Sequence, residues 1–160
     1  YEGALVALAV GRALGVPVVY EVRGFFESLW GKDLGRVEAA EVFRRRRDTD
    51  TRCMEAADAV VVPSRAEPFG NTAVEAMHAA RPLVASRVQG LAEVVTDAVT
   101  GLLVPADDAQ ALADALGSLA ADPNLAARLA EQGEREAAER FSVAGYRATM
   151  TRIVDDLVRR

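Results

Sequence analysis

Four short runs of β-forming residues, separated by longer stretches with helical spacing, constrain the fold of this chain most strongly. The runs lie at residues 18–22, 59–63, 82–86 and 101–104. A short, continuous apolar run is typical of a parallel strand buried on both faces, and alternation of such strands with helices favours a parallel sheet. The sequence therefore predicts an α/β domain of three layers, Rossmann-like, with about four parallel strands and helices on both faces.

Helical spacing dominates the rest of the sequence, because apolar residues recur there at intervals of three and four. Helices are expected at 2–14, 37–57, 71–80, 108–119, 124–140 and 143–160, and the segment 91–95 is ambiguous. The last three helices form a C-terminal helical segment, and Asp107 and Asp122 are expected to cap two of them. Residues 23–36 hold three glycines and no sustained period, so they are expected to form an irregular loop.

Length and charge narrow the range of partners. The 160 residues correspond to one domain, and 24 acidic residues against 19 basic ones give a net charge of -5. This balance argues against nucleic acid as a partner. The apolar stretches are too short or too interrupted for a membrane span, and there is no convincing signal peptide. Four consecutive arginines, 44–47, indicate a solvated helix or a peripheral contact with acidic surfaces or lipid headgroups.

The single cysteine and the single histidine also exclude some kinds of site. Cys53 alone permits neither an intrachain disulfide nor a cysteine-based zinc site, so a reducing compartment, the cytoplasm, is expected. Cys53 itself is expected to pack on a helix face. His78 is expected to be a packing or surface residue, because no second histidine exists to form a metal pair. The sequence therefore predicts no metal site.

The segment 63–77 carries the most specific chemical signal, because it joins a buried strand to a helix through a tight turn. Gly70 permits close approach of the backbone to a ligand. The first amides of the helix, at residues 71–73, suit a phosphate or diphosphate. Glu75, one turn into the helix, is placed to accept hydrogen bonds from sugar hydroxyls, and Glu67 lies eight positions earlier. Two carboxylates are therefore predicted to bracket one anion.

This segment resembles the donor motif of the retaining nucleotide-sugar glycosyltransferases of the two-domain GT-B fold, particularly glycosyltransferase family 4, the glycosyl transferases group 1. The family motif reads Glu, any seven residues, Glu, which matches Glu67 and Glu75. The resemblance continues in order through residues 81–86, 90–95 and 101–105. It implies transfer of a sugar from a nucleotide diphosphate sugar to an acceptor hydroxyl, with retention and without a required metal or other cofactor. The acceptor would be a glycan, a lipid or a small molecule.

The resemblance also implies roles for individual residues. Glu75 would bind the nucleotide ribose, Glu67 would contact the transferred sugar as the catalytic carboxylate, and the turn between them would hold the diphosphate and the sugar. The turn residues concerned are Gly70, Asn71 and Thr72.

The family also places an arginine and a lysine against the donor diphosphate, and this chain has no such pair at the corresponding place. Arg65 and Arg87 flank the motif and are candidate substitutes. Arg23 ends the first strand, where it would either face the cleft or form a structural salt bridge.

The resemblance divides the chain into two parts that together form one composite domain. Residues 1–62 resemble part of the acceptor-side, amino-terminal domain of the family, and residues 63–160 resemble the second half of the donor-binding domain. Two further readings stay open: an unrelated doubly wound binding domain, and a non-catalytic remnant. The remnant would bind nucleotide weakly or self-associate through an exposed sheet edge and the aromatic residues Phe25, Phe26 and Trp30.

Overall fold

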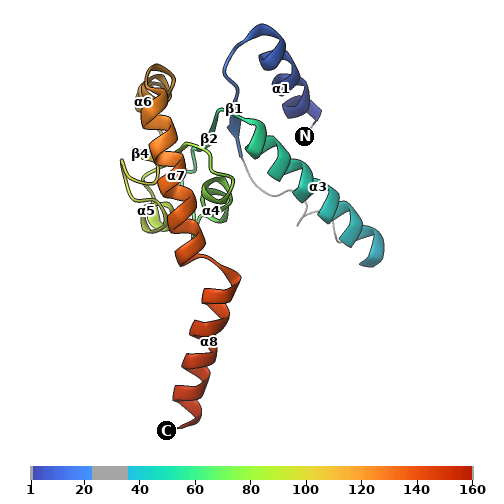
Figure 1. Ribbon diagram of the computed structural model, residues 1–160, viewed down its shortest axis with the longest axis vertical. Coiled ribbons are helices and arrows are strands. Elements are labelled where there is room, and N and C mark those ends of the chain that lie inside the picture. Colours follow the sequence, from blue (N-terminus) through green and yellow to red (C-terminus); the bar gives the residue numbers. More distant parts are fainter. Residues whose placement is uncertain (1, 23–35, 160) are drawn as a thin grey trace.

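The computed structural model describes residues 2–22 and 36–159 (Figure 1). Of the expected loop at 23–36, residues 23–35, which include Arg23, Phe25, Phe26 and Trp30, lie outside the described residues, and Arg36 begins a helix instead. Four strands form one sheet in the order β1-β2-β3-β4, and every neighbouring pair is parallel. The strands are β1 (Val19–Glu21), β2 (Ala59–Val62), β3 (Leu83–Ser86) and β4 (Leu102–Val104). The predicted parallel sheet is therefore confirmed.

The predicted helices are also confirmed, and the ambiguous segment forms a short helix. They are α1 (Glu2–Leu14), α3 (Arg36–Ala56), α4 (Asn71–His78), α5 (Gln89–Val94), α6 (Ala109–Ala121), α7 (Pro123–Arg140) and α8 (Val143–Val158). Both α4 and α5 are short, with eight and six residues. They cross from one parallel strand to the next, as helices in such folds do.

One predicted helix cap is confirmed and the other is wrong. The Asp122 carboxylate accepts hydrogen bonds from the backbone N–H groups of Asn124 and Leu125 at the start of α7. At the start of α6 the cap is Asp108, whose carboxylate accepts from the Ala111 N–H at 2.9 Å. Asp107 adopts a left-handed φ of 59°, and its side chain instead binds an arginine. An N-cap residue has non-helical, usually extended backbone, so the left-handed turn moves the cap one position on.

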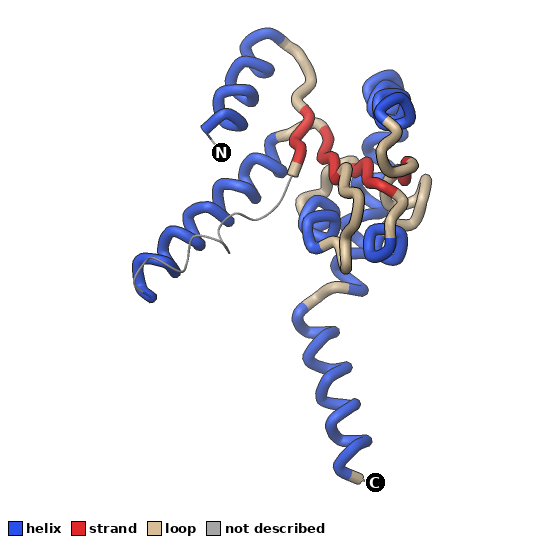
Figure 2. The backbone as a smooth tube through the Cα atoms, turned by 180° about the vertical axis from the view of Figure 1, so that it is seen from behind, coloured by secondary structure: helices blue, strands red, loops and turns tan. Residues whose placement is uncertain are grey.

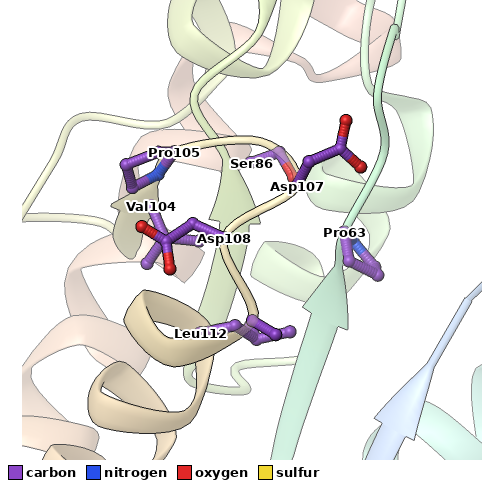
Figure 3. Close-up of a pocket in the computed structure, with 8 residues that line it drawn as sticks. Pro63, Ser86, Val104, Pro105, Asp107, Asp108 and Leu112 are labelled. Atoms are coloured by element: carbon purple, nitrogen blue, oxygen red, sulfur yellow. The ribbon is translucent and has the colours of Figure 1, made fainter.

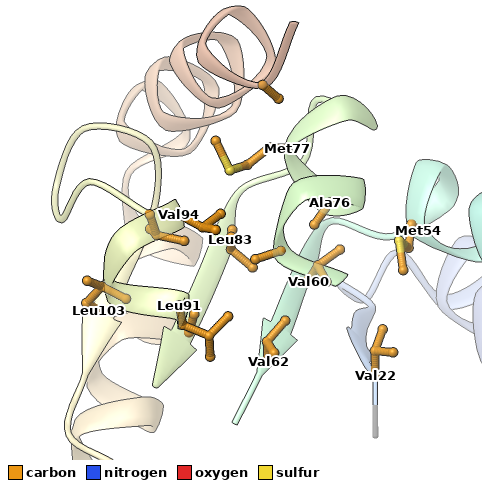
Figure 4. Close-up of a cluster of buried hydrophobic side chains, with 14 residues drawn as sticks. Val22, Met54, Val60, Val62, Ala76, Met77, Leu83, Leu91, Val94 and Leu103 are labelled. Carbon is orange, nitrogen blue, oxygen red and sulfur yellow. The ribbon is translucent and has the colours of Figure 1, made fainter. Parts of the chain in front are cut away.

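Two apolar clusters, one on each face of the sheet, make up the core. In Figure 4 side chains from α3, α4 and α5, such as Met54, Met77 and Leu91, pack on β2 and β3. On the opposite face, α6 and the first half of α7 cover Val61 and Val84 with buried residues that include Leu129. The sheet therefore lies between two helical layers, which confirms the predicted three-layer arrangement.

Cys53 lies at the α3 side of this core and is fully buried, so its predicted packing role is confirmed. Burial of the thiol raises its pKa, and the negative charge of nearby Asp50 adds to this effect. The buried Asp50 carboxylate in turn accepts a 2.6 Å hydrogen bond from the Tyr20 hydroxyl, which joins α3 to β1. His78 is exposed on the last turn of α4, where a surface position was one of the two expectations.

The C-terminal helix α8 leads away from the rest of the molecule in both views of the chain (Figures 1 and 2). Its residues are exposed, including five apolar side chains spaced at three and four positions. These are Val143, Tyr146, Met150, Ile153 and Leu157. Across residues 2–22 and 36–159, no helix combines the length and the apolar character needed to cross a membrane.

Candidate functional site

The turn between β2 and α4 forms as the sequence predicts and depends on a glycine. Gly70 is the residue that precedes the first turn of α4, with a left-handed φ of 100°. A Cβ at this position would lie 2.9 Å from Cδ2 of Leu91 on α5. Backbone with positive φ and a neighbour this close favour glycine over any other residue. The turn therefore lies directly against α5, at the carboxyl end of β2.

Glu67 folds back onto this turn. Its Oε1 atom accepts a hydrogen bond from the Gly70 N–H at 3.2 Å, and its backbone carbonyl accepts from the Gly90 N–H at 3.0 Å. The carboxylate is partly buried at the N-terminal end of α4, where a negative charge is favoured by the helix dipole. Glu67 is thus held over the start of α4 by both its side chain and its backbone.

This geometry changes the predicted anion site. The Ala73 N–H donates to the Gly70 carbonyl at 2.9 Å, so the expectation that it is free for a ligand is wrong. The reason is that the first turn of α4 closes a tight hydrogen bond of its own. Within the described segments no acceptor engages the amides of Asn71 and Thr72. Any anion at this turn would therefore depend on these two amides.

Glu75 lies one turn further along α4, on the same side as Asn71. Residues four apart share a helix face, and both side chains are exposed, whereas Thr72 and Ala73 between them are buried. The structure thus brings together the predicted residues Glu67, Asn71 and Glu75 on one turn and the exposed face of one helix.

A cavity of about 260 Å³ opens at the carboxyl ends of three strands (Figure 3). Pro63 follows β2, Ser86 ends β3, and Pro105 follows β4. Ligands of open parallel sheets bind at this edge. The cavity is also lined by Asp107, whose carboxylate binds the Arg65 Nε at 2.6 Å. Both of these side chains are mostly exposed, 83% for Arg65 and 63% for Asp107, so solvent screens this ion pair.

Arg87, the second candidate cation, is held between β3 and β4. Its N–H donates to the Val104 carbonyl at 2.7 Å, and its guanidinium donates to the Leu103 carbonyl and pairs with Asp97. Asp97 in turn accepts a 2.9 Å hydrogen bond from the Leu103 N–H. A donor contact with Arg87 would have to compete with these partners.

The pKa of Asp97 lies below its ordinary value. Partial burial alone would raise it, but hydrogen bonds from Leu103 and Arg87 and the positive charge of Arg87 outweigh that effect. When folding lowers the pKa of a carboxyl group, the ionised group stabilises the folded protein at pH values above its ordinary pKa of about 3.9. This stabilisation is lost as the pH falls through the pKa of the group in the folded protein. Because the pair is largely exposed, the contribution is small, about 0.5 kcal/mol.

We therefore expect the Leu103 amide resonance to titrate with a midpoint below about 3.9, because its N–H reports the charge on Asp97. An NMR titration from neutral to acidic pH measures this midpoint. In Asp97→Asn the same resonance should show no such titration, and a wild-type midpoint at or above the ordinary value would contradict the ion pair.

Long-range partners of the site were not found by sequence reasoning. Gly90 donates to Glu67, Asp97 pairs with Arg87, and Asp107 pairs with Arg65. The two members of each pair are 10 to 42 positions apart in the sequence. Of these three partners, only Gly90 lies within a segment that resembles the family, and the sequence contains no other indication of these contacts. Arg23, the other candidate, lies outside the described residues. Where side chains are described, no three His, Cys, Asp or Glu residues gather as a metal site would need.

A family model described as glycosyl transferases group 1 matches residues 41–136. The chain therefore belongs to the glycosyl transferases group 1 family.

Curated relatives carry glycosyltransferase names. A D-inositol 3-phosphate glycosyltransferase of Xylanimonas cellulosilytica is 42% identical over 135 residues, which cover 84% of this chain and 31% of the relative. One from Saccharomonospora viridis is 47% identical over 100 residues, or 62% of this chain and 22% of the relative. The chain thus spans between about a fifth and a third of the length of these relatives.

Solved structures share the fold. A sucrose-phosphate synthase from Thermosynechococcus elongatus superposes with a TM-score of 0.67 at 29% identity, covering 92% of this chain and 48% of the other. The HepE protein of Anabaena, solved in complex with UDP, gives a TM-score of 0.68 at 21% identity and covers 92% of this chain and 52% of the other. The predicted α/β, Rossmann-like fold class is confirmed, and so is the resemblance to glycosyltransferases of the GT-B fold.

Proposed function

We propose that this chain is a glycosyltransferase, or a shortened derivative of one, that moves a sugar from a nucleotide diphosphate sugar to an acceptor hydroxyl, and that its residues 63–160 bind the donor. The observation that carries this proposal is the Gly70 turn, which places Glu67 over the start of α4 and Glu75 on its exposed face. The proposal includes retention of configuration at the sugar and no required metal ion or other cofactor. The single free, buried Cys53 fits a reducing compartment, so the cytoplasm is the proposed location.

In the proposed reaction the bond between the sugar C1 and the diphosphate oxygen breaks, and its electron pair leaves with the nucleoside diphosphate. The acceptor oxygen forms the new bond to C1, and its proton passes to the departing diphosphate. The backbone N–H groups of Asn71 and Thr72 would donate to a phosphate oxygen, as amides at helix starts do. Glu75 would accept from the ribose hydroxyls.

Glu67 is better placed for sugar hydroxyls than for phosphate. Its carboxylate already occupies the Gly70 N–H, and a negative group here would repel a second anion. Hydroxyl groups, in contrast, can donate to its remaining lone pairs. Arg65 would reach the diphosphate only by leaving Asp107, and Arg87 only by leaving Asp97, so both have competing carboxylates.

These competing carboxylates favour a second candidate, a non-catalytic remnant that binds nucleotide weakly or self-associates. Neither candidate cation, Arg65 or Arg87, is unpaired, and a missing electrostatic contact to the departing diphosphate costs about 2.7–4 kcal/mol of transition-state stabilisation. The composite division, with residues 1–62 from the acceptor side and 63–160 from the donor side, is part of the proposal. The parallel pairing of β1 with β2 supports one composite domain. The family model matches residues on both sides of the division at residue 62, so the match does not mark this boundary.

Titration of the purified chain with UDP, GDP and ADP tests the proposal by calorimetry. We expect one nucleotide to bind, and Glu75→Ala to weaken it by about ten-fold or more, because a hydrogen bond to a charged group contributes about 1.5–3 kcal/mol. Glu131→Ala, which removes an exposed carboxylate from α7, is the matched control and should bind as the wild type does.

Two results would decide between the candidates. Failure to bind any of the three nucleotides at millimolar concentration would remove donor binding. Transfer or hydrolysis of a labelled donor sugar, lost in Glu75→Ala, would exclude the remnant.

A further inference from the structure

Arg65 and Asp107 form an ion pair that joins two loops at the carboxyl edge of the sheet. Arg65 lies between β2 and α4, two residues before Glu67, and Asp107 lies between β4 and α6. The Arg65 Nε donates to the Asp107 carboxylate at 2.6 Å. Asp107 also lines the cavity at this edge, where ligands of open parallel sheets bind. The pair therefore lies at the edge of the sheet where a donor would bind.

Neither side chain has another partner in the described part of the chain. Within residues 2–22 and 36–159, Asp107 accepts only from Arg65, and Arg65 donates only to Asp107. The cap of α6 is Asp108, so the Asp107 carboxylate is not needed there. The backbone does not require it either, because glycine adopts a φ of 59° most readily. Among the described contacts, the Asp107 carboxylate therefore serves only to hold Arg65.

Arg87, the other candidate cation, has a structural role that Arg65 lacks. Its guanidinium binds the Leu103 carbonyl as well as Asp97, and Asp97 also accepts from the Leu103 N–H. The guanidinium of Arg65 has five N–H donors, and the described residues engage one of them. Of the two cations, Arg65 is therefore the one that can turn to a phosphate without breaking contacts between strands.

Exchange of the Arg65 partner has a low energetic cost. Both side chains of the pair are largely exposed, and ion pairs of this kind contribute little to stability. A diphosphate carries more negative charge than one carboxylate, and a guanidinium can bind phosphate oxygens through two parallel hydrogen bonds. Asp107 opposes this exchange in two ways, because it competes for Arg65 and repels the diphosphate.

We propose that Asp107 determines how tightly this chain binds a nucleoside diphosphate. Asp107 holds Arg65 until a donor binds, and Arg65 then leaves the carboxylate and pairs with the diphosphate. This inference rests on the proposed function, because the anion concerned is the diphosphate of the donor. Asp107 acts through Arg65 and does not itself touch the donor.

Calorimetric titration with UDP, GDP and ADP tests this proposal on the full chain. Asp107→Asn removes the charge but keeps the shape of the side chain, and asparagine also adopts left-handed backbone. We expect this variant to bind nucleoside diphosphate about threefold more tightly than the wild type, because it removes the competition of one exposed ion pair. The gain should vanish at about 1 M salt, where the Debye length is about 3 Å.

A double-mutant cycle shows whether the gain passes through Arg65. Arg65→Gln should weaken diphosphate binding several-fold, and the double variant with Asp107→Asn should bind no more tightly than Arg65→Gln alone. Uridine, guanosine and adenosine carry no phosphate, so Asp107→Asn should bind them as the wild type does. Asp114→Asn removes an exposed carboxylate elsewhere on α6 and is the charge-matched control, which should leave binding unchanged.

The outcomes separate this inference from donor binding. Equal diphosphate binding by Asp107→Asn and the wild type would overturn the inference and leave donor binding in place. A gain that persists without Arg65, or that extends to the nucleosides, would overturn it as well. Binding by Asp107→Asn where the wild type shows none would support both proposals. Absence of binding by every variant at millimolar nucleotide would remove donor binding and this inference together.

Discussion

Replacing Gly90 by alanine is expected to lower the free energy of unfolding by about 3 kcal/mol, the upper part of the range for an inserted methyl group in a packed site. A Cβ at Gly90 would lie 2.5 Å from the Cα and N atoms of Phe69 and 2.6 Å from its carbonyl carbon. These are backbone atoms, which cannot rotate away as the end of a side chain can. The turn that carries Glu67 and Gly70 would have to move off α5, and the Gly90–Glu67 hydrogen bond would lengthen.

Gly117 is the matched control for this substitution. It lies within α6, and a Cβ there would meet nothing within 4 Å. Gly117→Ala should therefore raise the free energy of unfolding by about 0.5–1 kcal/mol, the usual gain of alanine over glycine inside a helix. Urea unfolding followed by circular dichroism measures both variants. If Gly90→Ala proved as stable as the wild type, the close seating of the turn on α5 would be wrong.

The contrast between these two glycines shows which features of the fold can be predicted from the sequence and which cannot. Gly117 lies in a segment with helical spacing and Gly90 directly precedes the ambiguous segment 91–95, but neither context shows whether a side chain would fit at the glycine. Only the return of the chain after β3, which brings Gly90 against Phe69, makes one of them irreplaceable. The four strands were predictable because contiguous runs of apolar, β-forming residues, such as 59–63, mark buried strands. The turn was predictable for the same reason, since its residues are neighbours in sequence.

Contacts with distant residues, and the exact backbone conformation of turns, were not predictable. Arg65 and Arg87 look like free cations in the sequence, but their carboxylate partners follow 42 and 10 residues later. The sequence predicts Asp107 as the helix cap, and only the left-handed backbone at Asp107 shows that the next residue, Asp108, is the cap instead. The hydrogen bond between Ala73 and Gly70 likewise depends on how tightly the first turn of α4 closes.

Glu67→Gln is expected to lower the rate of donor turnover by about ten- to 100-fold, because a hydrogen bond from a sugar hydroxyl to a charged carboxylate contributes about 1.5–3 kcal/mol, with little change in stability. Glutamine keeps a carbonyl oxygen that can accept from the Gly70 N–H, so the turn should survive while the negative charge is lost. Release of nucleoside diphosphate from UDP-glucose, GDP-mannose and ADP-glucose measures turnover, and urea unfolding measures stability.

Glu67→Ala separates the two roles of this carboxylate. It removes the acceptor for the Gly70 N–H as well as the charge, so we expect the same loss of turnover and, in addition, a loss of about 1 kcal/mol of stability, the usual net contribution of one hydrogen bond. If Glu67→Gln turned over donor at the wild-type rate while Glu67→Ala did not, the carboxylate would act only through the shape of the turn. Equal loss in both variants, with stability lowered only in alanine, requires the negative charge itself, because that is the one property both substitutions remove.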